Sequence, residues 1–257
     1  RRNPVSTSET DITEDGFLDN SFAVLQPKQG AHRAGLDAVL LAACVPPEEQ
    51  GLVADLGAGT GVAGMAVAQR CPLARVEMVE NDPASAAHLR RSIALPRNAH
   101  LAARLLVTEA DVTTLEGARF SHVIANPPFN AGGRQASPHN RRAAAHMARD
   151  GLLTGWVKAA ARICLPGGRL TMVLRPDNLA EVRAAMKESF GAKTVLPIAA
   201  KQGRDPMRVL VTSICGAPEG ERELPYLVLH QADGSFTPPV EDSLRGRRGI
   251  DLSVPSG

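Results

Sequence analysis

The sequence predicts an α/β fold with a mostly parallel sheet of seven or eight strands and an antiparallel edge at its C-terminal end. Three observations support this fold class. Between residues 52 and 189, apolar runs of strand length alternate with runs of helical character, which indicates a parallel sheet covered by helices on both faces. After residue 190, three apolar runs follow with few residues between them, and such neighbours pair more easily as antiparallel strands. The chain has 257 residues and is 44% hydrophobic, which is ample for one well-filled core.

The elements follow in a simple order. Residues 1–15 are polar and we expect them to be frayed, and the stretch 17–35 is irregular. A first helix spans 36–44, where Asp37 lies in the first turn and favours the helix dipole, and Pro46-Pro47 ends it. The predicted strands of the alternating part are 52–56, 75–80, 105–108, 120–125 and 170–174. The predicted helices are 62–70, 84–95, 141–164 with a break near Gly151, and 179–189. The final strands are 194–198, 207–214 and 226–229.

This order predicts one domain over residues 17–240, preceded by a flexible segment, 1–16, and followed by a loose tail, 241–257. We find no internal repeat and no linker long enough to divide the chain. No feature of the sequence indicates an oligomeric state.

Composition narrows the functional classes. The net charge is +2, so any nucleic-acid contact must come from local basic patches. The cysteines stand far apart, without a C-x-x-C motif or a Cys/His cluster, which argues against a zinc site or any other metal. The sequence has no apolar stretch of membrane-spanning length and no signal-peptide core, and its separated cysteines are typical of reduced thiols. These features predict a cytoplasmic protein. The cysteines are Cys44, Cys71, Cys164 and Cys215.

A glycine-rich turn follows the first predicted strand of the alternation. Its sequence runs from Asp55 to Gly61 as D-L-G-A-G-T-G, and a helix begins directly after it. Glycines at such a turn let the backbone approach a ligand closely, at the edge where open α/β sheets bind ligands. Asp55 could accept a hydrogen bond from a ligand ammonium, and Glu80, at the end of the next strand, from two ribose hydroxyls.

The same residues also fit a dinucleotide site. Residues 59–64 match G-x-G-x-x-G, and Glu80 stands at the spacing of the acidic residue in that motif. An NAD-dependent dehydrogenase or a nucleotide-binding module is therefore a second hypothesis. The placement of Asp55 at the end of its strand suits an amino-acid ammonium better than a pyrophosphate. Asp111 could accept from an adenine amino group with Val112 offering a backbone N–H, although a turn cap explains Asp111 equally well.

The most informative motif is Asn126-Pro127-Pro128-Phe129, at the end of the fourth strand. An exocyclic aromatic amine is a poor nucleophile because its lone pair is delocalised into the ring. The side-chain oxygen of Asn126 and the carbonyl of Pro127 could accept its two N–H groups, while the prolines stiffen the turn and Phe129 stacks on the ring. Together with the glycine turn, this predicts methyl transfer from S-adenosylmethionine (SAM) to a planar nitrogen, with adenine as the first choice. The motif has no role in hydride transfer.

These motifs resemble those of the bacterial tRNA(Val) adenine-N6-methyltransferase family. The stretch from Gln26 to Ala43 is similar to the family's segment ahead of the first strand, and the resemblance covers most of residues 17–240. It implies a Rossmann-like class I methyltransferase fold, SAM as the donor, and RNA as the substrate, in particular the adenosine 3′ of a tRNA anticodon. The catalytic residues are then Asn126, Pro127 and Phe129. The implied cofactor-binding residues are Gln26, Arg33, Asp55, Gly57, Ala58, Gly59, Gly61, Glu80, Asn81, Asp111, Val112 and Asn126.

One departure leaves the acceptor open. Phe129 stands where enzymes of that family often carry Tyr, and Phe is frequent in related enzymes that methylate a guanine amino group of ribosomal RNA. The glutamine amide of a protein is a further acceptor that suits this motif. The reaction stays the same in each case.

Basic residues near the predicted sheet edge are candidates for RNA contact. Arg141 and Arg142 follow the acceptor motif, and Lys201, Arg204 and Arg208 form a second cluster. A third cluster comprises Arg245, Arg247 and Arg248. Solvated surface positions explain a single arginine equally well. Trp156 and the histidines His32, His139 and His146 are interpreted as packing or capping residues.

Overall fold

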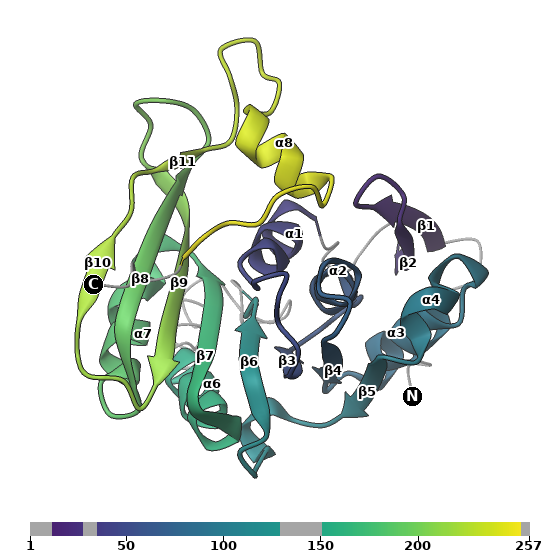
Figure 1. The fold of residues 1–257 in the computed structure, drawn as a ribbon, viewed down its shortest axis with the longest axis horizontal. Coiled ribbons are helices and arrows are strands. Elements are labelled where there is room, and N and C mark those ends of the chain that lie inside the picture. Colours follow the sequence, from purple (N-terminus) through teal and green to yellow (C-terminus); the bar gives the residue numbers. More distant parts are fainter. Residues whose placement is uncertain (1–11, 28–34, 129–150, 253–257) are drawn as a thin grey trace, which may run out of the picture.

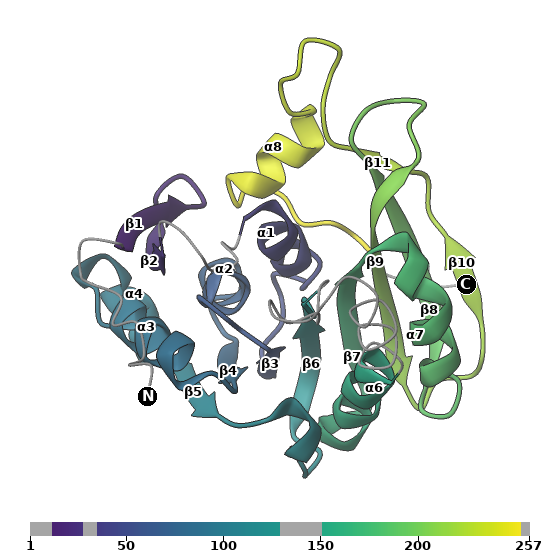
Figure 2. The same ribbon diagram turned by 180° about the vertical axis from the view of Figure 1, so that it is seen from behind.

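The computed structural model describes residues 12–27, 35–128 and 151–252 of the chain. Within these residues a nine-stranded sheet has the strand order β10-β8-β9-β7-β6-β3-β4-β5, with β11 paired to β8. Figures 1 and 2 show this sheet crossing the molecule, with helices on both sides. The predicted fold class, a mostly parallel sheet in an α/β fold, is confirmed.

The elements of the sheet and the helices agree with the predicted ranges to within a few residues over most of the alternating region. The strands of the main sheet are β3 (Leu52–Leu56), β4 (Arg75–Glu80), β5 (Leu105–Glu109), β6 (Phe120–Ala125), β7 (Cys164–Leu174), β8 (Phe190–Ala199), β9 (Pro206–Cys215), β10 (Glu221–Glu223) and β11 (Leu227–Val228). The α-helices are α1 (Leu36–Ala43), α2 (Val62–Arg70), α3 (Pro83–Ile93), α4 (Ala99–Ala102), α6 (Leu152–Ile163), α7 (Leu179–Met186) and α8 (Pro238–Leu244). Short 3₁₀ turns are η2 (Pro96–Asn98), η3 (Val112–Thr114) and η4 (Pro176–Asn178).

Two apolar cores lie on opposite faces of the sheet. One core gathers side chains of α1, α2 and α3 under the sheet face that carries Leu196, Ile198 and Leu210. The other is built around α6 and α7 and the alternate side chains of the same strands, such as Val195 and Val209. The period of two along each strand therefore sends neighbouring residues to different cores. This fixes the register of the sheet and the direction of the side chains at its edges.

The antiparallel pairing expected near the C-terminal end of the sheet is made by β9. This strand pairs antiparallel with β7 on one side and with β8 on the other. The two short outer strands, β10 and β11, run parallel to β8. β9 therefore starts at the edge of the sheet where its two neighbours, β7 and β8, end.

The predicted irregular start of the chain is wrong for residues 12–27. β1 (Ile12–Phe17) and β2 (Phe22–Pro27) form an antiparallel hairpin that packs against α3. Its turn places Leu18, Asp19 and Asn20 at positive φ, between 50° and 61°. Three consecutive residues with left-handed backbone are unusual when none of them is glycine. Because the turn lacks the Asn-Gly or Asp-Gly pair that marks many hairpins, the sequence did not indicate it.

The predicted loose tail is likewise wrong as far as Leu252. α8 packs on α1, as Figure 1 shows, and Ile250 donates its N–H to the carbonyl of Ala43 at 2.7 Å. Arg245 and Arg247 form ion pairs with Asp19 of the hairpin turn, at 3.2 and 3.0 Å. The third basic cluster thus contains two arginines that bind the protein's own carboxylate.

α6 begins directly after Gly151, which has φ 105° and caps the helix, so the predicted break at this residue stays a prediction. The part of the predicted helix before it, residues 141–150, lies outside the described residues. No helix among the described residues is both long and apolar enough to cross a membrane.

Candidate active site

A cavity of about 780 Å³ opens at the carboxyl ends of β3, β4, β6 and β7. The strand order changes beside β3, which has β4 on one side and β6 on the other, and open α/β sheets form ligand sites at such a point. The described residues that line it are Pro27, Ala38, Asp55, Gly57, Ala58, Gly59, Thr60, Val62, Ala63, Glu80, Asn81, Ser85, His88, Asp111, Val112, Thr113, Asn126, Pro127, Pro128, Leu152, Trp156, Arg175 and Arg208.

Backbone angles and close contacts explain why the turn after β3 contains glycines. Gly57, Gly59 and Gly61 all have positive φ, at 65°, 55° and 86°. A Cβ on Gly57 would lie 2.5 Å from the ring of Trp156, and a Cβ on Gly61 would collide with Leu89. A Cβ on Gly59 would meet no atom of the described residues within 4 Å. Gly59 lines the cavity, so there is room beside it for a bound ligand.

Asp55 is buried, with 2% of its surface exposed, and its Oδ2 accepts a hydrogen bond from the N–H of Gly64 at 2.8 Å. Burial raises the pKa of Asp55 to about 7, the bond from Gly64 lowers it, and the nearby charge of Glu80 raises it. A buried carboxylate beside an open cavity favours a cationic ligand group, because that group would compensate the charge.

Glu80 links the end of β4 to the glycine turn. Its Oε2 accepts from the N–H of Gly59 at 2.7 Å, and its Oε1 accepts from the N–H of Asp82 at 2.8 Å. These bonds hold the carboxylate in one orientation while each oxygen keeps a further lone pair. Glu80 can therefore accept hydrogen bonds from neighbouring hydroxyls of a ligand.

Asp111 serves as the cap of η3 and also lines the cavity. Its Oδ1 accepts from the backbone N–H and the hydroxyl of Thr113, at 2.8 and 2.7 Å. These bonds, led by the one from the hydroxyl, lower the pKa of Asp111 and keep it ionised. Of the two interpretations of Asp111, the cap is observed, and its place in the cavity wall leaves the ligand contact possible.

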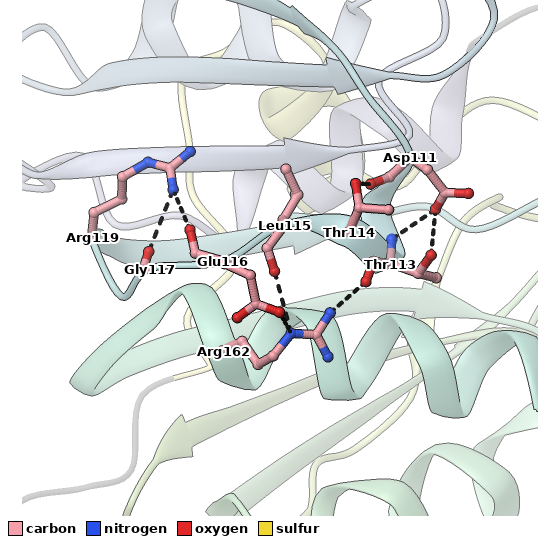
Figure 3. A network of polar contacts seen from close by, with 8 residues as sticks. All are labelled: Asp111, Thr113, Thr114, Leu115, Glu116, Gly117, Arg119 and Arg162. Atoms are coloured by element: carbon pink, nitrogen blue, oxygen red, sulfur yellow. Dashed lines mark hydrogen bonds and ion pairs between the residues drawn. The ribbon is translucent and has the colours of Figure 1, made fainter.

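The Asp111 loop is held from the opposite side by α6. Figure 3 shows Arg162 reaching from α6 to the carbonyls of Thr113 and Leu115, at 2.6 and 3.3 Å. Arg162 also forms an ion pair with Glu116 at 2.8 Å. The loop that carries Asp111 and Val112 is therefore fixed to the same helix that brings Trp156 to the cavity.

The acceptor motif lies at the end of β6, in the middle of the cavity. Asn126 is partly exposed, Pro127 is buried and Pro128 is exposed, and all three line the cavity. β6 lies between β3 and β7 in the sheet, so Asn126 separates the glycine turn from the two arginines of the cavity. Phe129, the last residue of the motif, lies outside the described residues.

The structure brings most of the predicted cofactor-binding residues together and separates others. Gln26 does not line the cavity: it is 1% exposed and its Nε2 donates to Asp15 across the hairpin at 2.8 Å. Its neighbour Pro27 reaches the cavity instead. Arg33 lies outside the described residues.

The predicted RNA-contacting residues also divide. Arg208 lines the cavity and donates from Nε to Asp37 at 2.8 Å. Lys201 and Arg204 are exposed in the tip between β8 and β9, and neither lines the cavity. Arg141 and Arg142 lie outside the described residues.

Several residues that line the cavity were missed by sequence reasoning, among them Trp156 and Arg175. Trp156, interpreted as packing, contacts Gly57 and lines the cavity, and Arg175 directly follows β7. The scarcity of aromatic residues was a signal for Trp156, because the chain has a single tryptophan. For Arg175, the position directly after a strand of the parallel sheet was the available signal. The described residues contain no group of three or more His, Cys, Asp or Glu arranged to hold a metal ion.

Comparisons with known proteins agree on one family. The methyltransferase small domain family matches residues 33–202. A tRNA1(Val) (adenine(37)-N6)-methyltransferase of Porphyromonas gingivalis is 28% identical over 225 residues, covering 81% of this chain and 85% of that protein. The enzyme of the same name from Aeromonas hydrophila is 27% identical over 226 residues, covering 86% and 92%. A crystal structure from Agrobacterium tumefaciens, described as a predicted O-methyltransferase, is 36% identical with a TM-score of 0.74, covering 85% of this chain and 100% of that one.

Proposed function

The chain belongs to the methyltransferase small domain family and is a SAM-dependent methyltransferase. We propose that it methylates the exocyclic amino group of an adenine in RNA, and that this adenine lies near the anticodon of a tRNA. The observation that carries this proposal is the position of Asn126-Pro127-Pro128 in one cavity with the glycine turn. The names of the Porphyromonas and Aeromonas relatives support adenine and tRNA. The Agrobacterium protein is described as an O-methyltransferase, but an amide followed by two prolines suits an amine with two N–H groups better than a hydroxyl.

The residues on the β3–β4 side fit SAM as the donor. Asp55, Glu80 and Asp111 place three carboxyl groups around this part of the cavity, which suits a ligand with ammonium and sulfonium charges. Thr60 Oγ1 is buried and has no hydrogen-bond partner among the described residues, so a ligand oxygen could accept from it. The space beside Gly59 gives the ligand room.

We assign roles on this basis. Asp55 would bind the ammonium group, Glu80 the ribose hydroxyls, and Asp111 and Val112 the adenine, while Gly57, Ala58, Gly59, Gly61 and Asn81 would surround the ligand. SAM supplies an electrophilic methyl group. On the acceptor side, the Asn126 oxygen and the Pro127 carbonyl would accept the two N–H groups of the amine and turn its lone pair toward that methyl. Placement and electrostatics then carry the rate, and the proton can leave after the new C–N bond forms.

The acceptor can be identified directly. We expect tritium from labelled SAM to enter tRNA from a strain that lacks this protein, and digestion to nucleosides to give N6-methyladenosine. Total RNA, ribosomes and release factors from the same strain serve as parallel substrates. Appearance of the label in N2-methylguanosine or in methylglutamine would contradict the proposed acceptor, and binding of NAD without SAM would contradict the donor.

The pKa of Asp55 predicts that SAM binding depends on pH. In the free protein this carboxyl is about half protonated near pH 7, and an ammonium group favours its ionised form. Below that pKa a proton must leave before binding, so the apparent Kd should rise as the pH falls, by about tenfold between pH 8 and pH 6. Calorimetric titration in buffers of different ionisation enthalpy would measure both Kd and the released proton.

The variant Asp55→Asn provides the control for this pH dependence. The amide cannot titrate, so the Kd of this variant for SAM should be weaker than that of the wild type and should change much less between pH 8 and pH 6. An equally steep pH dependence in Asp55→Asn would show that another group is responsible.

A further inference from the structure

The cavity has charges of opposite sign at its two ends. Among the described residues that line it, the acidic ones are Asp55, Glu80 and Asp111, which follow or end the neighbouring strands β3, β4 and β5. The two arginines that line it, Arg175 and Arg208, stand at β7 and β9, on the other side of Asn126. A ligand spanning the cavity should therefore be cationic on one side and anionic on the other.

The two arginines are neighbours across the sheet. The last pair of the β7–β9 ladder joins Leu174 to Val209, so the next position along both strands brings Arg175 opposite Arg208. Leu174 and Val209 point into the α6–α7 core, so alternation sends both arginines to the α1 side of the sheet. Arg208 meets Asp37 of α1 there, at 2.8 Å. Like charges directly opposite each other on antiparallel strands repel, and an anion bound between them would reduce that repulsion.

We propose that Arg175 and Arg208 form a binding site for a phosphate group of the acceptor RNA, next to the adenine held at Asn126. This inference rests on the proposed function, because it takes the acceptor to be a nucleotide. Guanidinium groups bind phosphate through paired N–H donors, and two of them can hold one phosphodiester from two directions. Asp37 fixes the orientation of Arg208, and Arg175, which the sequence did not single out, completes the site.

Through this site the protein would recognise the negative charge of the RNA phosphate backbone as well as the base. A glutamine side chain in a protein presents an amide without a neighbouring phosphate, so the two arginines favour a nucleotide over that acceptor. The phosphate contact positions the strand without reading its sequence, while the planar base is selected at Asn126.

The first test measures binding without methyl transfer. The probes are a tri-ribonucleotide with a central adenosine and the same molecule with uncharged methylphosphonate linkages, each titrated into the protein with S-adenosylhomocysteine. We expect the charged probe to bind at least tenfold more tightly, and Arg175→Gln to remove most of that difference. Equal binding of the two probes, or failure of both to bind, would overturn the phosphate site. Preference for an acidic glutamine-containing peptide over both would do the same.

The second test uses the full reaction on tRNA. For Arg175→Gln we expect the KM for tRNA to rise about tenfold, the Kd for SAM to stay within twofold, and the slope of log KM against log salt concentration to fall by about 1. Arg175→Lys should recover part of the loss. Arg90→Gln is the matched control: Arg90 is a half-exposed arginine that pairs with Glu109 at 3.2 Å at the far end of the sheet. An unchanged salt slope in Arg175→Gln would overturn the inference.

The two tests separate this inference from the proposed function. If the charged trinucleotide binds through Arg175 but no RNA is methylated, the phosphate site is supported and the proposal of an RNA acceptor is contradicted. If tRNA is methylated at adenine but substitution of Arg175 changes neither probe binding nor the salt slope, the proposed function is supported and the phosphate site is contradicted.

Discussion

Replacing Asn126 with alanine is expected to reduce methyl transfer by at least about a hundredfold to a thousandfold, while the Kd for SAM stays nearly unchanged. The reason is the position of Asn126 between the acidic and basic ends of the cavity, where its oxygen would accept an N–H of the acceptor amine. Single-turnover rates with saturating tRNA, together with calorimetric SAM binding, measure the two quantities separately.

Asn126→Asp provides the comparison for this prediction. Aspartate keeps an accepting oxygen at the same distance from the backbone and replaces the donating NH₂ group with a second accepting oxygen and a negative charge. It should therefore retain much more activity than alanine. If alanine and aspartate are equally inactive, the NH₂ group is the essential part, and if alanine retains normal turnover, Asn126 has no part in the reaction.

Replacing Gly59 with alanine is expected to weaken SAM binding by about tenfold or more while the protein stays folded. A Cβ at Gly59 would enter the cavity without meeting a protein atom, so its contact would be with the ligand. The cost to the free protein should be limited to the left-handed backbone, about 1–2 kcal/mol. An overpacked ligand contact adds about 1–3 kcal/mol to the binding free energy, and each 1.4 kcal/mol is about a factor of ten.

Gly117→Ala is the matched control for Gly59→Ala. Gly117 also has positive φ and open space around its Cα, and it does not line the cavity. Both variants should lose similar amounts of stability in urea unfolding, but only Gly59→Ala should weaken SAM binding. Equal SAM affinity in the two variants would mean that SAM does not lie against the glycine turn.

The part of the cavity wall around the glycine turn could be predicted from the sequence because its residues lie at or near strand ends. Asp55, Glu80 and Asn126 each stand at the end of an apolar strand, and parallel strands bring such ends to one edge. The positive φ values of the glycine turn follow the pattern of its glycines. Local sequence and sheet topology were sufficient for this part.

The features of the structure that the sequence did not predict depend on contacts between distant parts of the chain. The β1–β2 hairpin lacks a glycine turn and is held by contacts with α3. The place of Arg175 opposite Arg208 depends on the β7–β9 register, which joins residues from separate parts of the chain. Gln26 was assigned to the cofactor on the family resemblance, but strand alternation in the hairpin turns it toward Asp15 and leaves Pro27 at the cavity. None of these follows from local pattern.

The reversed direction of β9 has a consequence for how such an enzyme can diversify. Parallel strands supply the donor side, where a change in one loop also disturbs the helix that follows it. β9 reaches the same edge through the short tip at 200–205, which connects two antiparallel strands and carries no helix. Insertions and substitutions in that tip can accumulate across generations without altering the glycine turn. The part of the cavity wall at Arg208, where β9 begins, can therefore vary among descendants of one ancestral scaffold while the glycine turn remains the same.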